Sequence, residues 1–123
     1  MTIYKIASGI RLWLDDNRDP KDPKIQQLFG AKGDEVWVKT VSEAKDHILH
    51  SHVGFISFDN DLGLEEEGSD LASWIEEMAY YKKLSRIEWT VHSRNAVESK
   101  NIYMAMMNAD KFWEEQEKTV RPK

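Results

Sequence analysis

Cysteine is absent from this chain of 123 residues, glycine and proline are scarce (six and three), and no long apolar run is present. Without cysteine, disulfide bonds, thiolate metal sites and a cysteine nucleophile are excluded, and the composition fits the reducing cytoplasm. A membrane-spanning helix needs about 18 consecutive apolar residues, which no segment approaches, and the first residues lack the apolar core of a secretory signal. We therefore expect a cytoplasmic protein that does not have a membrane as a partner.

The size and composition are those of one globular domain. The chain is 41% hydrophobic and 32% charged, which supplies apolar material for a core and charge for the surface. A domain of this length buries roughly two thirds of its unfolded surface, so it folds without disulfides. We expect a single domain over residues 1–123, with a folded core at 10–113 and a polar C-terminal tail at 114–123.

Short apolar segments alternate with helical patterns along the chain. The segments typical of buried strands are 10–14, 36–38, 55–58 and 87–91. Each strand segment is followed by residues that favour the start of a helix. In chain order these residues are Asp22-Pro23 (with Gly30 as the helix end), Thr40-x-x-Glu43, Gly68-Ser69 before an apolar stripe, and Asn95-x-x-Glu98. This β-α-β-α-β-α-β-α order predicts a three-layer α/β/α fold with a parallel sheet and four β-α units.

Polar, chemically capable side chains follow three of the four expected strands. Asp15 and Asp16 follow the first, Asp59 follows the third, and His92 with Ser93 follows the fourth. In parallel sheets of this class, ligands bind beyond the carboxyl ends of the strands. Converging carboxylates repel one another unless a cation neutralises them, and hard oxygen ligands suit Mg²⁺ or Mn²⁺.

The same face carries groups suited to a phosphate. Arg18 lies in the loop after the first strand, and Ser93, Arg94 and Asn95 precede the last helix, whose N-terminus favours anions. We expect Asp15 or Asp16, together with Asp59, to bind a metal directly, and Asp61 to contribute through a backbone carbonyl, through a water or not at all. This combination points to phosphoryl or phosphodiester chemistry.

Each of these residues also has a plain structural interpretation. An aspartate after a strand is often a turn or helix cap, and His92 is either a catalytic acid, metal ligand or phosphate donor, or a buried histidine with a satisfied hydrogen bond. The run Glu65–Glu67 is typical of a solvated loop. We expect most Trp and Tyr side chains to be buried in the core, with Trp13 or Tyr80-Tyr81 as the candidates for exposure. The remaining histidines, His47, His50 and His52, gather near the C-terminal end of an expected helix, where protonated histidines suit the helix dipole and no other residue supports a metal site.

The acidic residues resemble the pocket of response-regulator receiver domains, and four blocks resemble more closely a family known as the cyclic-phosphate processing receiver domain. The blocks are Leu14-Asp15-Asp16-Asn17-Arg18-Asp19-Pro20, Phe58-Asp59-Asn60-Asp61-Leu62-Gly63, Gly68-Ser69-Asp70-Leu71-Ala72-Ser73-Trp74 and His92-Ser93-Arg94-Asn95. The resemblance implies a flavodoxin/receiver-like fold with a truncated fifth unit. It also implies that Asp15 and Asp16 bind Mg²⁺, that Asp59 takes the phospho-acceptor place, and that Asp61 contributes its carbonyl.

Two features depart from an ordinary receiver. His92 stands where a threonine or serine is usual, with Ser93 adjacent, and we find no fifth strand ending in the lysine that contacts an acyl phosphate. These departures weaken a signalling interpretation and leave room for His92 as a catalytic group.

Three hypotheses follow. In the first, the protein is a Mg²⁺- or Mn²⁺-dependent phosphoesterase that hydrolyses cyclic phosphates or the 2′,3′-cyclic phosphate ends of RNA, with His92, Asp59 and Asp16 as catalytic residues and Arg18, Ser93, Arg94 and Asn95 binding the substrate. In the second, it is a non-catalytic receiver-like module that binds a protein partner and is switched by phosphorylation of Asp59. The third, a Toprim-like nuclease fragment, rests on Asp59-x-Asp61 but lacks the glutamate that this pattern has after its first strand.

The charge distribution limits the partner class. The net charge is −5, but residues 59–70 carry six acidic and no basic residues, so the rest of the chain sums to +1. The acidic balance argues against extensive binding of duplex DNA. A divalent ion at the acidic spot would remove much of the repulsion that a single phosphate or RNA end meets there.

Overall fold

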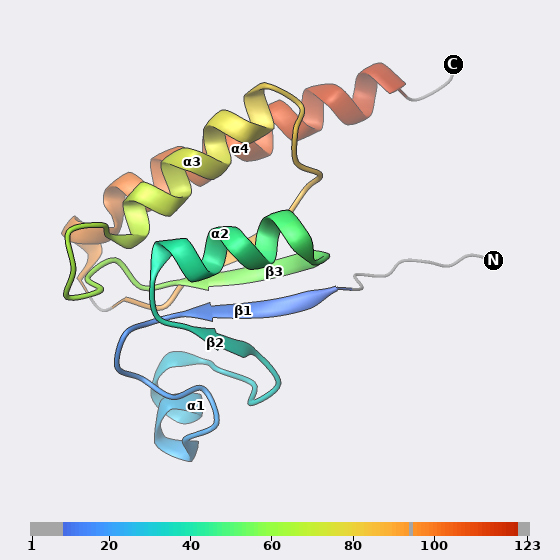
Figure 1. The fold of residues 1–123 in the computed structure, drawn as a ribbon. Helices are drawn as coiled ribbons and strands as arrows, with labels where there is room; N and C mark the ends of the chain where they lie inside the picture. Colours follow the sequence, from blue (N-terminus) through green and yellow to red (C-terminus); the bar gives the residue numbers. More distant parts are fainter. Residues whose placement is uncertain (1–8, 94, 121–123) are drawn as a thin grey trace.

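The computed structural model describes residues 9–93 and 95–120, which form four strands and four helices in strict alternation (Figure 1). In chain order these are β1 (Ile10–Leu14), α1 (Pro23–Phe29), β2 (Val36–Val38), α2 (Val41–His50), β3 (Val53–Phe58), α3 (Gly68–Tyr80), β4 (Glu88–Val91) and α4 (Ala96–Val120). The order of elements predicted from the sequence is therefore confirmed.

The four strands form one parallel sheet in the order β2-β1-β3-β4. The register pairs Leu14 of β1 with Val38 of β2 and with Phe58 of β3, and Phe58 with Val91 of β4. These four residues are the last of their strands, so all four strands end level with one another. A group that follows any strand directly therefore lies beside the groups that follow its neighbours.

The sheet separates two unequal layers of helix. In Figure 1, α2, α3 and α4 lie on one side of the sheet and the short α1 lies on the other, which confirms the three-layer α/β/α class. Alternate residues of each strand face the larger layer, and they form the core with the apolar stripes of α2, α3 and α4. Trp13 and Ser57 occupy the intervening positions and face the α1 side.

Local sequence signals set the ends of α1 and α2. The Asp22 side chain accepts a hydrogen bond from the backbone N–H of Lys24, and Gly30 ends α1 with φ 83°, a conformation that favours glycine. Thr40 caps α2 through the N–H of Glu43. Glu43 bonds the N–H of Lys39, one residue before the position that a complete capping box requires.

The start of α3 is tied to the end of β3. Glu65, Glu66 and Glu67 are all exposed, as expected for a solvated run, and Glu67 is in addition the N-cap of α3, where it forms a reciprocal capping box with Asp70. Gly68 donates its N–H to the carbonyl of Asn60 and packs so closely on the carbonyl of Asp59 that a Cβ at this position would collide with it. The first residue of α3 therefore fixes the backbone that carries Asp59.

The last helix is longer than the sequence indicates. Residues 114–120, expected to form a polar tail, continue α4 to Val120. At its other end, the Asn95 side chain accepts a hydrogen bond from the N–H of Glu98, as the Asn95-x-x-Glu98 pattern predicts. Helices α3 and α4 lie side by side along most of their length (Figure 1), because Ile102, Met106 and Ala109 are buried against the core.

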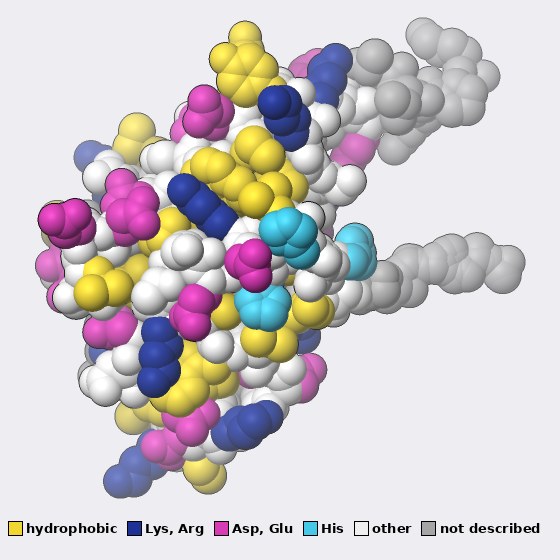
Figure 2. Space-filling model, viewed as in Figure 1, with side chains coloured by type: hydrophobic (Ala, Val, Ile, Leu, Met, Phe, Trp, Pro, Cys, Tyr) yellow, Lys and Arg dark blue, Asp and Glu magenta, His cyan; other side chains and the backbone are white. Residues whose placement is uncertain are grey.

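The three aromatic residues that the sequence marks as candidates for exposure differ in burial. Trp13 is buried, with 1% of its surface exposed, whereas Tyr80 and Tyr81 are each 59% exposed. Figure 2 shows histidine side chains grouped on the surface around the carboxyl-terminal end of α2. Within the ranges described, no helix is long and apolar enough to cross a membrane.

Candidate functional site

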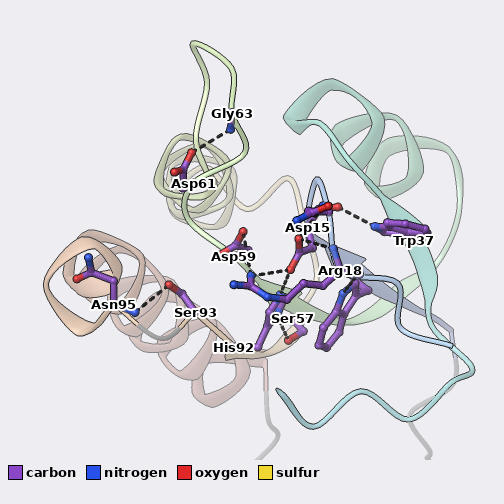
Figure 3. Close-up of polar contacts among 12 residues, drawn as sticks. Asp15, Arg18, Trp37, Ser57, Asp59, Asp61, Gly63, His92, Ser93 and Asn95 are labelled. Carbon is purple, nitrogen blue, oxygen red and sulfur yellow. Dashed lines mark hydrogen bonds and ion pairs between the residues drawn. The ribbon is translucent and has the colours of Figure 1, made fainter. Parts of the chain in front are cut away.

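Three polar residues extend the ladder of the sheet by one position. Asp15 donates its N–H to the carbonyl of Val38, Asp59 donates to Leu14, and His92 donates to Phe58. Each residue is therefore held by the neighbouring strand, and the three side chains converge at the carboxyl end of the sheet (Figure 3). The convergence that the sequence predicts for these three strand ends is thus present.

Asp15 is the most completely bonded carboxylate of the site. Its side chain is fully buried, and Oδ1 accepts the backbone N–H groups of Asn17 and Arg18, each at 2.9 Å. Oδ2 accepts Nε2 of His92 at 2.9 Å and Nη1 of Arg18 at 3.2 Å. Burial raises the pKa of Asp15, but the bonds from His92 and from the two N–H groups outweigh it and hold the pKa below its usual value.

His92 is buried and both of its ring nitrogens have partners. Nδ1 lies 2.8 Å from the hydroxyl of Ser57, opposite the bond from Nε2 to Asp15. The ring stacks on Trp13 at 3.8 Å between centroids, with Phe29 edge-on at 6.3 Å. Burial is the largest influence on the pKa of His92 and lowers it, although Asp15 acts in the opposite direction.

The protonation state of this group follows from its bonds. An ionised carboxylate only accepts, so Nε2 of His92 carries the hydrogen that bonds Asp15. Because the pKa of His92 is lowered, the ring is neutral, its Nδ1 accepts, and the Ser57 hydroxyl donates. Of the interpretations that the sequence leaves open for His92, this geometry favours the buried histidine with satisfied hydrogen bonds.

Arg18 lies between the two buried carboxylates. Its Nη1 is 3.2 Å from Oδ2 of Asp15 and 3.8 Å from Oδ2 of Asp59. The guanidinium stacks over the ring of Phe29, 4.3 Å from its centroid, and the Arg18 carbonyl accepts the indole N–H of Trp13 at 2.9 Å. The loop after β1 is therefore shaped so that a positive charge faces the carboxylates.

Asp59 is the carboxylate whose ionised form the site disfavours. It is 5% exposed, and burial, followed by the negative charge of Asp15, raises its pKa from 3.8 to about 7. Arg18 acts in the opposite direction and favours the ionised form. Near neutral pH the protonated and ionised forms of this carboxylate are therefore similarly populated, and an additional cation would stabilise the ionised form.

Asp16 completes a group of three carboxylates. One oxygen from each of Asp15, Asp16 and Asp59 lies within 4.8 Å of the others, and Asp16 is exposed. Its Oδ2 lies beside Gly63, where an added Cβ would be 3.0 Å away. Asp61 stands outside this group, because its Oδ1 accepts the N–H of Gly63 within its own turn (Figure 3).

A cleft of about 390 Å³ opens above the carboxylates. Its walls are Asp16, Asn17, Arg18, Asp59, Asp61, Gly63, Ser93, Asn95 and Glu98. The hydroxyl oxygen of Ser93 accepts the N–H of Asn95 at 3.2 Å, which positions both residues at the start of α4. Arg94, the fourth residue expected to bind substrate, lies outside the residues that the structure describes. Asp15 and His92 lie behind this cleft and do not line it.

The three other histidines lie at the opposite end of the sheet. His47 and His50 belong to the last turn of α2, and His52 directly precedes β3. His50 bonds the carbonyl and the carboxylate of Asp46, each at 3.1 Å. They are therefore separate from the acidic group.

Several residues of the site carry no recognisable sequence signal. Ser57 and Trp13 lie inside strands, and only the pairing register shows that they face the same side as His92. Trp37 donates its indole N–H to the carbonyl of Asp15 at 2.7 Å from the neighbouring strand β2. Phe29, which supports Arg18, is the last residue of α1. Strand alternation applied to 10–14 and 55–58 assigns Trp13 and Ser57 to one face, but not their contacts.

Comparison with known proteins yields one match. A family model described as "Cyclic-phosphate processing Receiver domain" matches residues 10–108, a range that contains all four blocks of the sequence resemblance. No curated protein and no solved structure matches the chain significantly.

Proposed function

We propose a function from one established premise, namely that the chain belongs to the cyclic-phosphate processing receiver domain family. The proposal is that the chain is a Mg²⁺- or Mn²⁺-dependent phosphoesterase that opens cyclic phosphates, including the 2′,3′-cyclic phosphate ends of RNA. The observation that carries it is the juxtaposition of three carboxylates and an arginine at the base of a cleft that also holds Ser93 and Asn95.

The donor set fits a hard divalent cation. Receiver domains typically bind Mg²⁺ through such an acidic group, and here one oxygen from each carboxylate lies within 4.8 Å of the others. Burial, followed by the negative charge of Asp15, raises the pKa of Asp59 against the effect of Arg18, so a cation bound beside it would stabilise its ionised form. A cation bound there would supply polarisation of the phosphate and activation of water.

We assign the cation to all three carboxylates, with Asp16 and Asp59 on the cleft side and Asp15 behind them. Asp16 is exposed and lines the cleft, and Asp59 forms part of the floor. Asp61 lines the same cleft but uses its side chain in a local turn, so it would contribute only through its backbone.

The phosphate would bind on the side of the cleft formed by α4. Ser93 and Asn95 lie there, and the unpaired N–H groups of a helix N-terminus favour an anion. Arg18, which also lines the cleft, adds a positive charge that can form two parallel bonds to a phosphate. The phosphorus would then lie between the carboxylates and these donors.

His92 takes a supporting role in this proposal. A role as proton donor to the leaving oxygen would require Nε2 to leave Asp15, and the ring does not line the cleft. We therefore assign His92 to the orientation of Asp15. Hydrolysis adds one water across one ester bond of the ring, so the product is a linear phosphomonoester with one free hydroxyl.

The direct experiment is incubation with a 2′,3′-cyclic nucleotide, with Mg²⁺, with Mn²⁺ and with a chelator. The proposal predicts ring opening that requires metal and is lost in Asp16→Asn and Asp59→Asn. Asp46→Asn is the matched control, because Asp46 is an exposed aspartate on α2 at the opposite end of the sheet. Absence of turnover, or turnover that these site variants leave unchanged, would overturn the proposal.

A second candidate is a non-catalytic module that binds a protein partner. Membership of a receiver family and the central position of Asp59 favour it. A small phosphodonor with Mg²⁺ should then add one phosphate to the mass of the protein, and Asp59→Asn should abolish the addition. An unchanged mass would exclude the switch.

A further inference from the structure

The Arg18 guanidinium lies where a cation between the carboxylates would be expected. A single nitrogen, Nη1, faces Oδ2 of Asp15 at 3.2 Å and Oδ2 of Asp59 at 3.8 Å. These two aspartates supply two of the three members of the acidic group. The arginine and a metal ion would therefore compete for the same carboxylates.

The bonding of Asp15 makes this competition strict. An ionised carboxylate has about four lone-pair positions, and Asp15 already accepts four hydrogen bonds. Two come from the backbone N–H groups of Asn17 and Arg18, one from His92 and one from the Arg18 guanidinium. The first three come from backbone groups and from a ring stacked on Trp13. The guanidinium is the one donor on a flexible side chain.

We infer that the Arg18 guanidinium acts as the counter-ion of the acidic group. A divalent ion must displace this guanidinium from Asp15 and Asp59 in order to bind, and Arg18 thereby sets the metal affinity of the site. This inference rests on the proposed function, since it concerns the same metal position. The displaced guanidinium remains in the cleft that it already lines together with Ser93 and Asn95. Metal binding thus frees Arg18 for a phosphate.

Phe29 provides a means of testing displacement without changing any charge. Its ring lies 4.3 Å from the guanidinium carbon and holds Arg18 in the position that bridges the carboxylates. Such contacts contribute modestly at partly exposed sites. If Arg18 has to move, weakening this contact makes metal binding easier, and if Arg18 stays in place, the metal affinity does not depend on it.

The experiment measures the affinity of the chain of 123 residues for Mn²⁺ alone, from the electron paramagnetic resonance signal of the free ion. Arg18→Gln should bind Mn²⁺ at least about tenfold more tightly than the wild type, because it removes a charge bonded to two of the carboxylates. Phe29→Leu should bind roughly two- to fivefold more tightly, as expected from the loss of one cation–π contact. Phe29→Met repeats the second test with a different apolar side chain.

Matched controls lie at the other end of the molecule. Arg86→Gln removes the same charge next to Glu117 and Asp110, and Phe112→Leu shortens a ring that packs on Tyr80. Both should leave the Mn²⁺ affinity at the wild-type value. Thermal unfolding of every variant verifies that it is folded.

The outcomes separate the inference from the proposed function. If Arg18→Gln binds more tightly but both Phe29 variants match the wild type, Arg18 acts only through its charge and displacement is wrong. If none of these variants differs from the wild type, the inference fails while the metal site stands. If neither the wild type nor any variant binds Mn²⁺, the metal-dependent function fails as well.

Discussion

Nε2 of His92 donates to Oδ2 of Asp15 across 2.9 Å, between two strands that β3 separates in the sheet. Ser57 on β3 bonds the other ring nitrogen at 2.8 Å, so three adjacent strands are joined by one chain of side-chain hydrogen bonds. All three residues are at least nine-tenths buried. This chain fixes the carboxylate that in turn holds Arg18.

Replacement of His92 by alanine should be strongly destabilising. The substitution removes one of the four hydrogen bonds to the buried Asp15 carboxylate, leaves the Ser57 hydroxyl without this partner and opens a void against Trp13. We expect a loss of about 3 kcal/mol in the free energy of unfolding, from two lost hydrogen bonds in buried positions and one cavity. Urea denaturation measures it, and a loss below about 0.5 kcal/mol, typical of a surface position, would disprove the structural role.

Ser57→Ala tests the outer bond of the same chain. Removing the hydroxyl should cost about 1 kcal/mol, because Nδ1 of His92 then lacks a donor in a buried position. Ser73→Ala is the matched control, since Ser73 is exposed on α3 and should change stability by less than about 0.5 kcal/mol. Equal effects of the two substitutions would show that the bond contributes nothing.

The protonation state of His92 is testable by nitrogen NMR. Because burial lowers its pKa, the ring should take up its second proton at a lower pH than a free histidine does, and at neutral pH it should carry its hydrogen on Nε2. A group with a lowered basic pKa takes up its proton at a higher pH when unfolded, so its contribution to stability decreases as the pH falls below about 6.5. A ring that is doubly protonated at pH 7 would contradict the assignment.

Asp59→Asn should stabilise the metal-free protein at alkaline pH. The pKa of Asp59 is raised from 3.8 to about 7 in the folded state, so the wild type loses stability as the pH rises from about 4 to 7, by up to a few kcal/mol at about 1.4 kcal/mol per pKa unit, and the loss is complete above pH 7. The advantage of the variant should be full at pH 8 and decline as the pH falls through 7 toward 4. Thermal unfolding with a chelator at several pH values measures this.

Magnesium should reverse that order. The ion would stabilise the wild type at pH 8 by binding its ionised carboxylates, and would affect Asp59→Asn less. If Asp59→Asn is less stable than the wild type at every pH without metal, the folded protein does not disfavour the ionised form of Asp59.

Gly68→Ala should damage the site from the side of α3. A Cβ at this position meets the carbonyl of Asp59, so either α3 or the end of β3 must shift, at a cost of roughly 1–3 kcal/mol. Gly30→Ala is the contrasting control, because nothing lies within 4 Å of its Cβ and only its φ of 83° opposes alanine, by about 1 kcal/mol. Urea denaturation should rank Gly68→Ala as the more harmful, and the reverse ranking would exclude the collision.

The fold was largely predictable because its local signals agree with one another. Apolar segments at 10–14 and 36–38 coincide with β1 and β2, and Asp22-Pro23 and Gly30 mark the ends of α1. Polar residues directly after three strands were sufficient to predict the convergence of Asp15, Asp59 and His92, because residues that follow neighbouring parallel strands lie at the same edge of the sheet.

What the sequence could not show are contacts between residues distant along the chain. The bond between Ser57 and His92 spans 35 positions, and that between Trp37 and the Asp15 carbonyl spans 22. No periodicity encodes either one. The position of Arg18 between Asp15 and Asp59 depends on the rotamer that Phe29 supports, and the capping role of Glu67 was hidden within an acidic run that has the composition of a solvated loop.

The most direct measurement of the central claim is hydrolysis of a short RNA ending in a 2′,3′-cyclic phosphate, followed by separation of the cyclic and linear ends. With Mn²⁺ or Mg²⁺ the wild type should convert the cyclic end to a linear phosphomonoester, and a chelator or Asp16→Asn should stop the conversion. Cyclic ends that remain intact with metal, or that open equally well with the chelator and in Asp16→Asn, would contradict a metal-dependent phosphoesterase at this site.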